Sequence, residues 1–244
     1  MKTDIKGNIM STPLDPSLLL KAYAAGIFPM ADGRDAADVY WVEPKRRGIL
    51  PLDDFRLSRS LAKTLKSGRF ETTLDHAFSD VVAMCATAAP DRPSTWINTQ
   101  IETAVTQLHN VGNAHSIETW LDGELVGGLY GIRLGRAFFG ESMFSRATDA
   151  SKVALAHLVA RMRAGGFTLL DCQFITPHLA TLGAVEVTRN RYMTLLSSAL
   201  STAGAGDFRA FDAGLPEAAS PPRTTVVSGP VSGWRIVQAL AQTS

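Results

Sequence analysis

Residues 115–144 read HSIETWLDGELVGGLYGIRLGRAFFGESMF, and this stretch decides the fold. The runs 115–121, 125–134 and 137–144 are strand-like, with apolar residues and few breaks. The turn sequences Asp122-Gly123 and Gly135-Arg136 separate these runs and are typical of tight hairpins. The stretch therefore predicts three antiparallel strands joined by two hairpins.

Helical and strand-like segments flank this centre on both sides. Two amphipathic helices are expected before it, over 76–88 and 101–111. After it, a helix begins at Thr148 or Asp149 and ends at Gly165-Gly166. Its predicted buried stripe consists of Leu155, Leu158, Val159 and Met162. The remaining predicted elements are a strand over 167–174, a helix over 178–182, a strand over 184–188 and a helix from Asn190. Hairpins followed by alternating helices and strands predict an α+β fold with one mixed sheet.

Composition along the chain suggests three parts. Asp15-Pro16-Ser17 opens a helix that ends at Gly26, and residues 27–51 are rich in Pro and Gly. We therefore expect a small amino-terminal domain over 1–70 and a larger domain over 71–203. Residues 204–244 are rich in Ala, Gly, Ser and Pro and form an extension, either flexible or with a short helix that begins at Trp234 and docks.

Length and composition exclude several classes of protein. The chain has 244 residues, 45% of them hydrophobic and 19% charged, which is enough to bury a core. No apolar run approaches the roughly 18 residues that a membrane span needs, and the first residues contain no apolar signal region. Cys85 and Cys172 are too few for a disulfide framework. We expect a soluble protein of the reducing cytoplasm, with no membrane partner.

Basic residues gather in one short segment, although the net charge of the chain is only +1. Those at 56, 59, 63 and 66 recur at helical spacing, on a helix capped near Ser58. Such a stripe is either a solvated face or a binding surface for RNA or DNA. The candidate contacts are Arg56, Arg59, Lys63, Lys66 and Arg69.

Polar residues on apolar strands are the candidates for chemistry. Asp171 and Gln173 share one face of a strand, because side chains alternate with a period of two. A carboxylate in such a run is costly to bury without a partner. Asp171 is therefore a strand-end cap, one half of an ion pair, or part of a polar pair beside a cleft. Glu141, between Phe139 and Met143, poses the same alternatives.

Other familiar motifs are absent from the sequence. Ser142 does not lie in a nucleophile elbow, since the residue two positions later is Phe144. The five histidines lack metal-ligand spacing, and no glycine-rich phosphate loop joins a strand to a helix. We expect neither a metal nor a cofactor.

A series of ordered motifs resembles one known family. They are Tyr23…Gly26-Ile-Phe-Pro29, Thr95-Trp96-Ile97, His115-Ser-Ile-Glu118, Leu125-Val-Gly-Gly-Leu-Tyr-Gly131, Gly140-Glu-Ser-Met-Phe-Ser145, Ala150-Ser-Lys152, Asp171-Cys-Gln173 and His178-Leu-Ala-Thr-Leu-Gly183. Over residues 14 to 196 the chain resembles the leucyl/phenylalanyl-tRNA–protein transferases. The resemblance implies a small amino-terminal domain followed by a mixed-sheet domain of the GNAT (acetyltransferase-like) type.

The resemblance also implies an activity. Such enzymes move Leu or Phe, and Met less well, from aminoacyl-tRNA to the α-amino group of proteins that begin with Arg or Lys, which marks those proteins for N-degron proteolysis. The reaction is aminolysis of an ester without a covalent enzyme intermediate. The basic stripe would then hold the acceptor stem of the tRNA. A monomer is expected.

Site residues follow from the matching motif positions. Asp171, Gln173 and Glu141 are implied to be catalytic, with Asp171 orienting Gln173 and the acceptor amine and Glu141 attracting its positive charge. The implied substrate-binding residues are Trp96, which stacks on the terminal adenine, with Trp41, Leu129, Met143, Leu158, Met162 and Leu170. This chain departs from the family where paired tryptophans are usual, because Val42 and Glu43-Pro44 follow Trp41. The effect on stacking and the preference for Leu over Phe stay open.

Three rival functions make different predictions. An acyl-CoA acetyltransferase needs a Gly-rich pyrophosphate loop before its main helix, and residues 145–152 contain no glycine. A non-catalytic RNA-binding protein would keep the basic stripe without needing the polar residues of the strands. A peptidoglycan-type aminoacyltransferase would share the donor but use a lysine side chain of a cell-wall precursor as acceptor.

Overall fold

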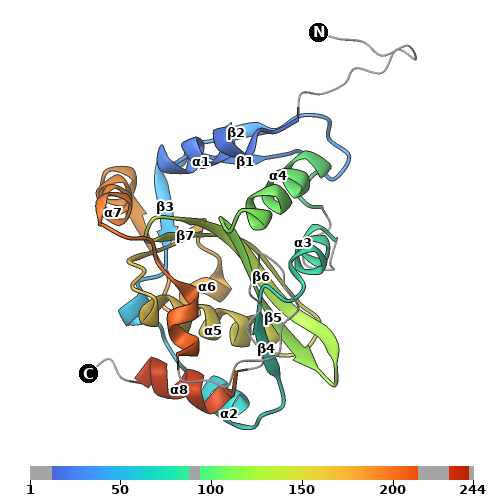
Figure 1. The fold of residues 1–244 in the computed structure, drawn as a ribbon, viewed down its shortest axis with the longest axis vertical. Helices are drawn as coiled ribbons and strands as arrows, with labels where there is room; N and C mark the ends of the chain where they lie inside the picture. Colours follow the sequence, from blue (N-terminus) through green and yellow to red (C-terminus); the bar gives the residue numbers. More distant parts are fainter. Residues whose placement is uncertain (1–12, 88–93, 214–230, 242–244) are drawn as a thin grey trace.

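The computed structural model describes residues 13–87, 94–213 and 231–241 (Figure 1). Its centre is a seven-stranded sheet with the strand order β4-β5-β6-β7-β8-β3-β9. The strands are β3 (Arg46–Ile49), β4 (Glu71–Leu74), β5 (Ala114–Leu121), β6 (Glu124–Leu134), β7 (Ala137–Ser145), β8 (Leu169–Gln173) and β9 (Val185–Thr188). Only β7 and β8 pair in parallel. The predicted α+β fold with one mixed sheet is confirmed.

The predicted meander forms β5, β6 and β7. Asp122 and Gly123 adopt positive φ values of 51° and 81° in the first turn, as a tight hairpin requires. The second hairpin turns at Gly135, with φ 58°. Local turn chemistry thus determines how these three strands pair.

The sheet incorporates a strand from the amino-terminal part of the chain. β3 lies between β8 and β9 and pairs antiparallel with both. By contrast, β1 (Phe28–Met30) and β2 (Tyr40–Val42) form a separate two-stranded ribbon. Residues before position 70 therefore contribute to two sheets, and one of these is the main sheet.

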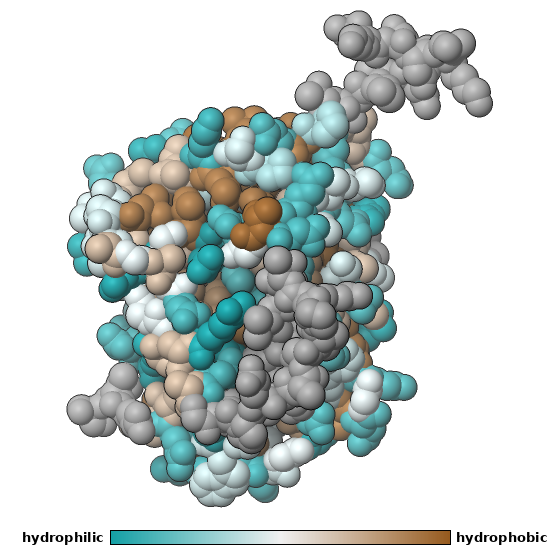
Figure 2. Space-filling view, viewed as in Figure 1, coloured by the Kyte–Doolittle hydropathy of each residue, from teal (hydrophilic) through white to brown (hydrophobic). Residues whose placement is uncertain are grey.

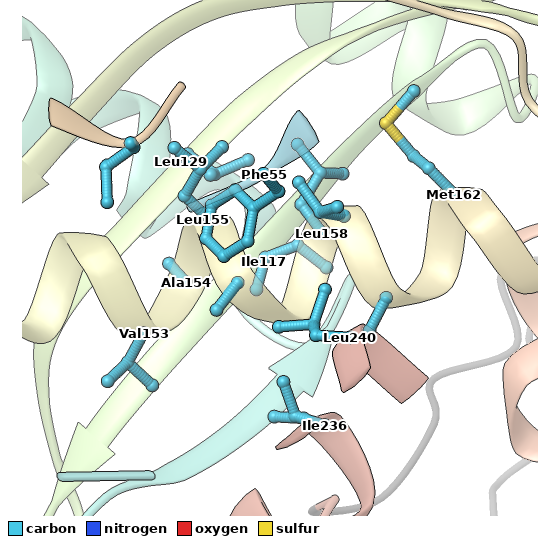
Figure 3. Close-up of a cluster of buried hydrophobic side chains, with 14 of the residues drawn as sticks. Phe55, Ile117, Leu129, Val153, Ala154, Leu155, Leu158, Met162, Ile236 and Leu240 are labelled. Carbon is cyan, nitrogen blue, oxygen red and sulfur yellow. The ribbon is translucent and has the colours of Figure 1, made fainter. Parts of the chain in front are cut away.

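One face of the sheet is covered by α5 (Ala150–Ala164). The sequence predicts one buried stripe, but residues around most of the helix circumference are buried. The reason is that α5 is covered on its outer side by α2 (Arg59–Lys66), by α8 (Gly233–Ala241) and by the 3-10 helix η2 (Phe208–Asp212). Figure 3 shows Leu155 and Leu158 of α5 between Leu129 of the sheet and Leu240 of α8.

The opposite face packs against four other helices. They are α1 (Pro16–Ala24), α3 (Phe78–Ala86), α4 (Thr99–Asn110) and α7 (Arg189–Ser201). The sheet thus has a hydrophobic core on each face, and neighbouring residues of a strand point into opposite cores. Phe138 packs on the face of α5, whereas Phe139 packs on the face of the other four helices. On the side shown in Figure 2, strongly hydrophobic residues gather in the upper half, between α7 and α4 of Figure 1.

Helix starts follow the predicted capping residues with one exception. Asp15 and Ser58 accept hydrogen bonds from the first turns of α1 and α2, as expected. Asp149 precedes α5 but makes no capping bond. Its carboxylate accepts instead from Lys152, at 2.8 Å, and from Thr64 of α2, at 3.4 Å. The Thr64 bond ties α2 to the start of the central helix.

The extension also contains structure. Residues 233–241 form α8, so the predicted terminal helix docks against α2 and α5. No helix within the described ranges combines the length and apolar character needed to cross a membrane.

Candidate active site

A pocket of about 300 Å³ lies where β7 and β8 separate. The two strands pair only over Ala137–Phe139 and Leu169–Asp171, so their later residues face an opening. The short helix α6 (Pro177–Thr181) covers one side of the pocket through His178 and Leu179. Seven predicted site residues line it: Trp96, Leu129, Glu141, Met143, Leu158, Leu170 and Gln173.

Three predicted site residues lie outside the pocket lining. Met162 is a fully buried core residue of α5, further along the helix than Leu158 (Figure 3). Trp41 lies in β2 and is 39% exposed. Asp171 is fully buried behind the lining residues. The pocket thus brings together most of the predicted catalytic and substrate-binding residues. Phe174, which was not predicted as a site residue, also lines the pocket, and half of its surface is exposed.

Glu141 reaches the pocket because β7 contains a bulge. Tyr130 pairs with Ser142 and Gly131 pairs with Gly140, which leaves Glu141 as the extra residue. A bulge turns a side chain out of the regular alternation. A Cβ atom on Gly131 would lie 2.3 Å from the carbonyl oxygen of Phe139, so the partner strand needs glycine at this point.

The environment of Glu141 favours its protonated form. Burial raises the pKa of Glu141 to about 7, and the neighbouring Tyr23 hydroxyl and Gln173 amide oppose that rise in pKa. The Gln173 Nε2 donates to Glu141 Oε1 at 2.9 Å, whereas the Tyr23 hydroxyl lies close without an aligned bond. A carboxyl with a pKa near 7 can give or accept a proton at neutral pH.

Gln173 is held in an unusual backbone conformation. Its φ is 59°, in the left-handed region that non-glycine residues seldom adopt. Its backbone N–H donates to Asp171 Oδ1 at 2.7 Å. Such strain persists only where surrounding contacts fix it, and it is common at functional sites. The Asp171 carboxylate provides one of those contacts and directs the Gln173 side chain toward Glu141.

Asp171 itself is fully engaged by other donors. Arg47 Nε donates to Oδ1 at 2.9 Å, and Arg47 Nη2 donates to Oδ2 at 2.7 Å. The Tyr192 hydroxyl also donates to Oδ2, at 2.7 Å. The ion pair was one of the alternatives that the sequence left open for Asp171. The polar pair beside a cleft is also present, because Asp171 contacts Gln173 at the pocket.

Arg47 and Tyr192 contact Asp171 but were not among the site residues predicted from the sequence. Arg47 is 1% exposed and lies between two aromatic rings, 4.5 Å from the centroid of Phe28 and 4.8 Å from that of Tyr192. Its sequence signal is weak: it shares the face of buried Ile49 two positions later. Tyr192 recurs with buried Leu196 at helical spacing in α7, which marks it as a core residue without indicating its partner.

The predicted basic surface lies next to the pocket wall. Its five residues, Arg56, Arg59, Lys63, Lys66 and Arg69, are all exposed. Three belong to α2, while Arg56 precedes the helix and Arg69 follows it. The backbone N–H of Arg56 donates to the carbonyl of Leu182 at 2.9 Å, directly after α6. The surface therefore begins at the helix that covers the pocket.

A larger cavity of about 770 Å³ lies elsewhere, near the end of α5. Its polar lining consists of Asp53, Asp54, Arg163, Thr168 and Arg191, and Leu170 is the one predicted site residue on its wall. The side chains arranged for chemistry lie in the smaller pocket.

The fold and the smaller pocket together define the class of protein. A mostly apolar pocket with a few polar groups at one end is typical of an enzyme that binds a small apolar group. The family model for leucyl/phenylalanyl-tRNA protein transferase matches residues 49–197, and the model for its amino-terminal domain matches residues 12–45. The chain belongs to the leucyl/phenylalanyl-tRNA–protein transferase family, and it is therefore an aminoacyltransferase.

Individual relatives agree with the family models. A leucyl/phenylalanyl-tRNA–protein transferase of Rhizorhabdus wittichii is 61% identical over 249 residues, covering 95% of this chain and 99% of the relative. One from Zymomonas mobilis is 62% identical over 193 residues, covering 79% and 72%. A solved carboxy-terminal domain of a putative lysylphosphatidylglycerol synthetase from Agrobacterium fabrum gives a TM-score of 0.38 at 10% identity, over 77% of this chain and 57% of that one.

Proposed function

We propose that this protein transfers Leu or Phe, and Met less well, from aminoacyl-tRNA to the α-amino group of proteins that begin with Arg or Lys, marking them for N-degron proteolysis. It acts as a monomer in the cytoplasm, and residues 71–203 form a GNAT-like catalytic domain that receives β3 from the amino-terminal unit. The observation that supports the proposal best is the pair Glu141–Gln173 at the polar end of an apolar pocket.

The chemistry requires little beyond orientation and proton removal. An α-amine with a reference pKa of about 7.7–8.0 is partly neutral in the cell and attacks the ester carbonyl. The new N–C bond forms and the C–O bond to the ribose breaks. The attacking amine loses one proton and the released ribose oxygen gains one, so the tRNA leaves with a free hydroxyl. Holding the two reactants together contributes up to roughly 7–11 kcal/mol to lowering the barrier.

Glu141 accepts the proton of the attacking amine in this proposal. It lines the pocket, and its pKa of about 7 matches that task. In its ionised form it also attracts the positive acceptor terminus. Gln173 is a neutral amide and too weak a base, so it orients the amine and Glu141 by hydrogen bonds. Asp171 does not line the pocket and positions Gln173.

The apolar part of the pocket holds the donor side chain. Leu129, Met143, Leu158 and Leu170 form walls that fit a flexible or aromatic apolar group, and Trp96 at the rim stacks on the terminal adenine. The five exposed basic residues next to α6 hold the acceptor stem through its phosphates.

Mass spectrometry of an acceptor peptide tests the proposed reaction. Purified protein is mixed with leucyl-tRNA or phenylalanyl-tRNA and a peptide that begins with Arg. We expect a mass gain of one Leu or Phe residue, and no gain for the same peptide when it is N-acetylated. If the aminoacyl-tRNA stays intact and the mass of the peptide does not change, the proposed acceptor is refuted. A mass gain on an internal lysine of the N-acetylated peptide would favour the cell-wall type of transferase.

The space in the pocket should determine how well Phe is used as a donor relative to Leu. Replacing Leu158 with Phe fills space between α5 and the sheet, so phenylalanyl-tRNA should lose about 10–200-fold in kcat/KM relative to leucyl-tRNA. The measurement is the ratio of kcat/KM for the two donors. The matched variant Met162→Leu, on the same helix but outside the pocket, should leave this ratio unchanged. An equal ratio in Leu158→Phe and the unmodified protein would remove Leu158 from the donor pocket.

A further inference from the structure

The docked helix α8 presents one large apolar side chain to solvent. Ile236, Val237 and Leu240 are buried against α2 and α5, whereas Trp234 in the first turn is 56% exposed. Tryptophan is enriched at binding surfaces, because its ring is large and apolar while its indole N–H is polar. The neighbours of Trp234 indicate which kind of partner its exposed face fits.

The start of α8 is fixed to the end of the basic helix. A Cβ atom on Gly233 would lie 1.9 Å from the carbonyl oxygen of Leu65, so only glycine permits this contact between the two helices. The backbone of Val231 bonds to Thr72 of β4, at 3.1 Å from N to O. Arg235 donates to the carbonyl of Ala213 at 3.1 Å. These contacts hold Trp234 in a defined place.

Trp234 lies directly beside the basic surface. The Lys66 ammonium is 4.6 Å from the centroid of the indole ring, a cation–π contact. None of the five basic residues of the surface forms an ion pair with another described residue. An exposed aromatic ring beside basic residues that lack carboxylate partners is the combination by which proteins bind the bases and phosphates of RNA.

We propose that α8 is part of the tRNA-binding surface and that Trp234 contacts the RNA of the donor directly, beside the phosphates that α2 neutralises. This inference rests on the proposed function, because that function supplies the tRNA. It assigns a role to residues 231–241, which lie beyond the matched family models. The affinity from an aromatic contact with a base or ribose does not depend on salt concentration. Each lysine–phosphate contact releases counterions, so the affinity that it contributes falls as salt is added.

Binding of leucyl-tRNA at several salt concentrations separates these contributions. Trp234→Ala should weaken binding about tenfold, as expected for one lost stacking contact, and leave the slope of log K against log salt unchanged. Trp234→Phe should recover part of the affinity. Lys66→Met should reduce the slope by about one. Gln238→Ala, an exposed position on the same helix, should bind like the unmodified protein, and the melting temperatures of all variants should agree.

Two results would overturn the inference. Trp234→Ala could bind leucyl-tRNA as tightly as the unmodified protein, or it could reduce the salt slope as Lys66→Met does, which would show that Trp234 acts only by holding Lys66. In either case the unmodified protein would still bind and use leucyl-tRNA, so the proposed function would stand. Absence of tRNA binding and of transfer in the unmodified protein would instead refute the proposed function.

Discussion

Replacing Glu141 with Gln should lower kcat/KM for transfer by about 10²–10⁴-fold, because the amine would lose its proton acceptor. The substitution keeps the size of the side chain, and the amide can still face Gln173 in the bulge. In the unmodified protein kcat/KM should rise as the pH passes through about 7, since Glu141 must lose its proton before it can accept another. A second rise near 8 belongs to the acceptor amine.

The pH–rate profile distinguishes proton transfer from simple attraction of the acceptor. In Glu141→Gln the rise near pH 7 should vanish and the rise near 8 should remain. Glu124→Gln, at the exposed start of β6, is the matched control and should retain both the rate and the profile. Retention of the rise near pH 7 in Glu141→Gln would assign that ionisation to another group. A change confined to the KM of the peptide would reduce the role of Glu141 to attraction.

Replacing Arg47 with Gln should destabilise the protein by about 3–5 kcal/mol, because it leaves the buried Asp171 carboxylate without its cation. Arg47→Lys retains a positive charge but loses the two-point contact, so its loss should be smaller. Urea denaturation measures the free energy of unfolding. The matched control is Arg46→Gln: Arg46 precedes Arg47 in β3, is exposed and pairs with Glu186 at the surface, so it should cost less than about 1 kcal/mol.

Activity of the folded Arg47 variants shows whether this pair also positions the site. Without Arg47, the Asp171 carboxylate loses the donors that fix its orientation and should hold the Gln173 backbone less well. We therefore expect a lower kcat for Arg47→Gln under conditions where the variant stays folded. Tyr192→Phe removes one donor from Asp171 and should lower kcat less. A loss of stability with an unchanged kcat would make the Arg47–Asp171 pair purely structural.

Local sequence signals predicted the centre of the molecule and most of the pocket. The hairpins of β5, β6 and β7 depend on turn residues only a few positions away, so the strand order there follows from the sequence. Periodicity singled out Glu141 and Gln173 as polar residues on apolar strands and Leu158 as a buried helix residue, whereas their roles came from motifs that resemble those of the family. The hydrogen bond between Glu141 and Gln173, and the position of all three residues in one pocket, required the structure.

Contacts between distant parts of the chain could not be predicted. Arg47 and Asp171 are 124 residues apart, and nothing in the local pattern of β3 indicates that it inserts between β8 and β9. The burial of most of α5 has the same origin, since α2 and α8 come from distant parts of the chain to cover it. Glu141 was identified, but the bulge that turns it into the pocket depends on the register with β6.

The insertion of β3 also determines when the site can form during synthesis. β3 is made early, yet both of its neighbours in the sheet follow more than a hundred residues later, and β9 extends to Thr188. Until those residues have left the ribosome, Arg47 has no carboxylate to hold and the early strand has no partner. Pairing between such distant segments makes folding slow. The newly made enzyme therefore stays inactive until most of its chain is complete.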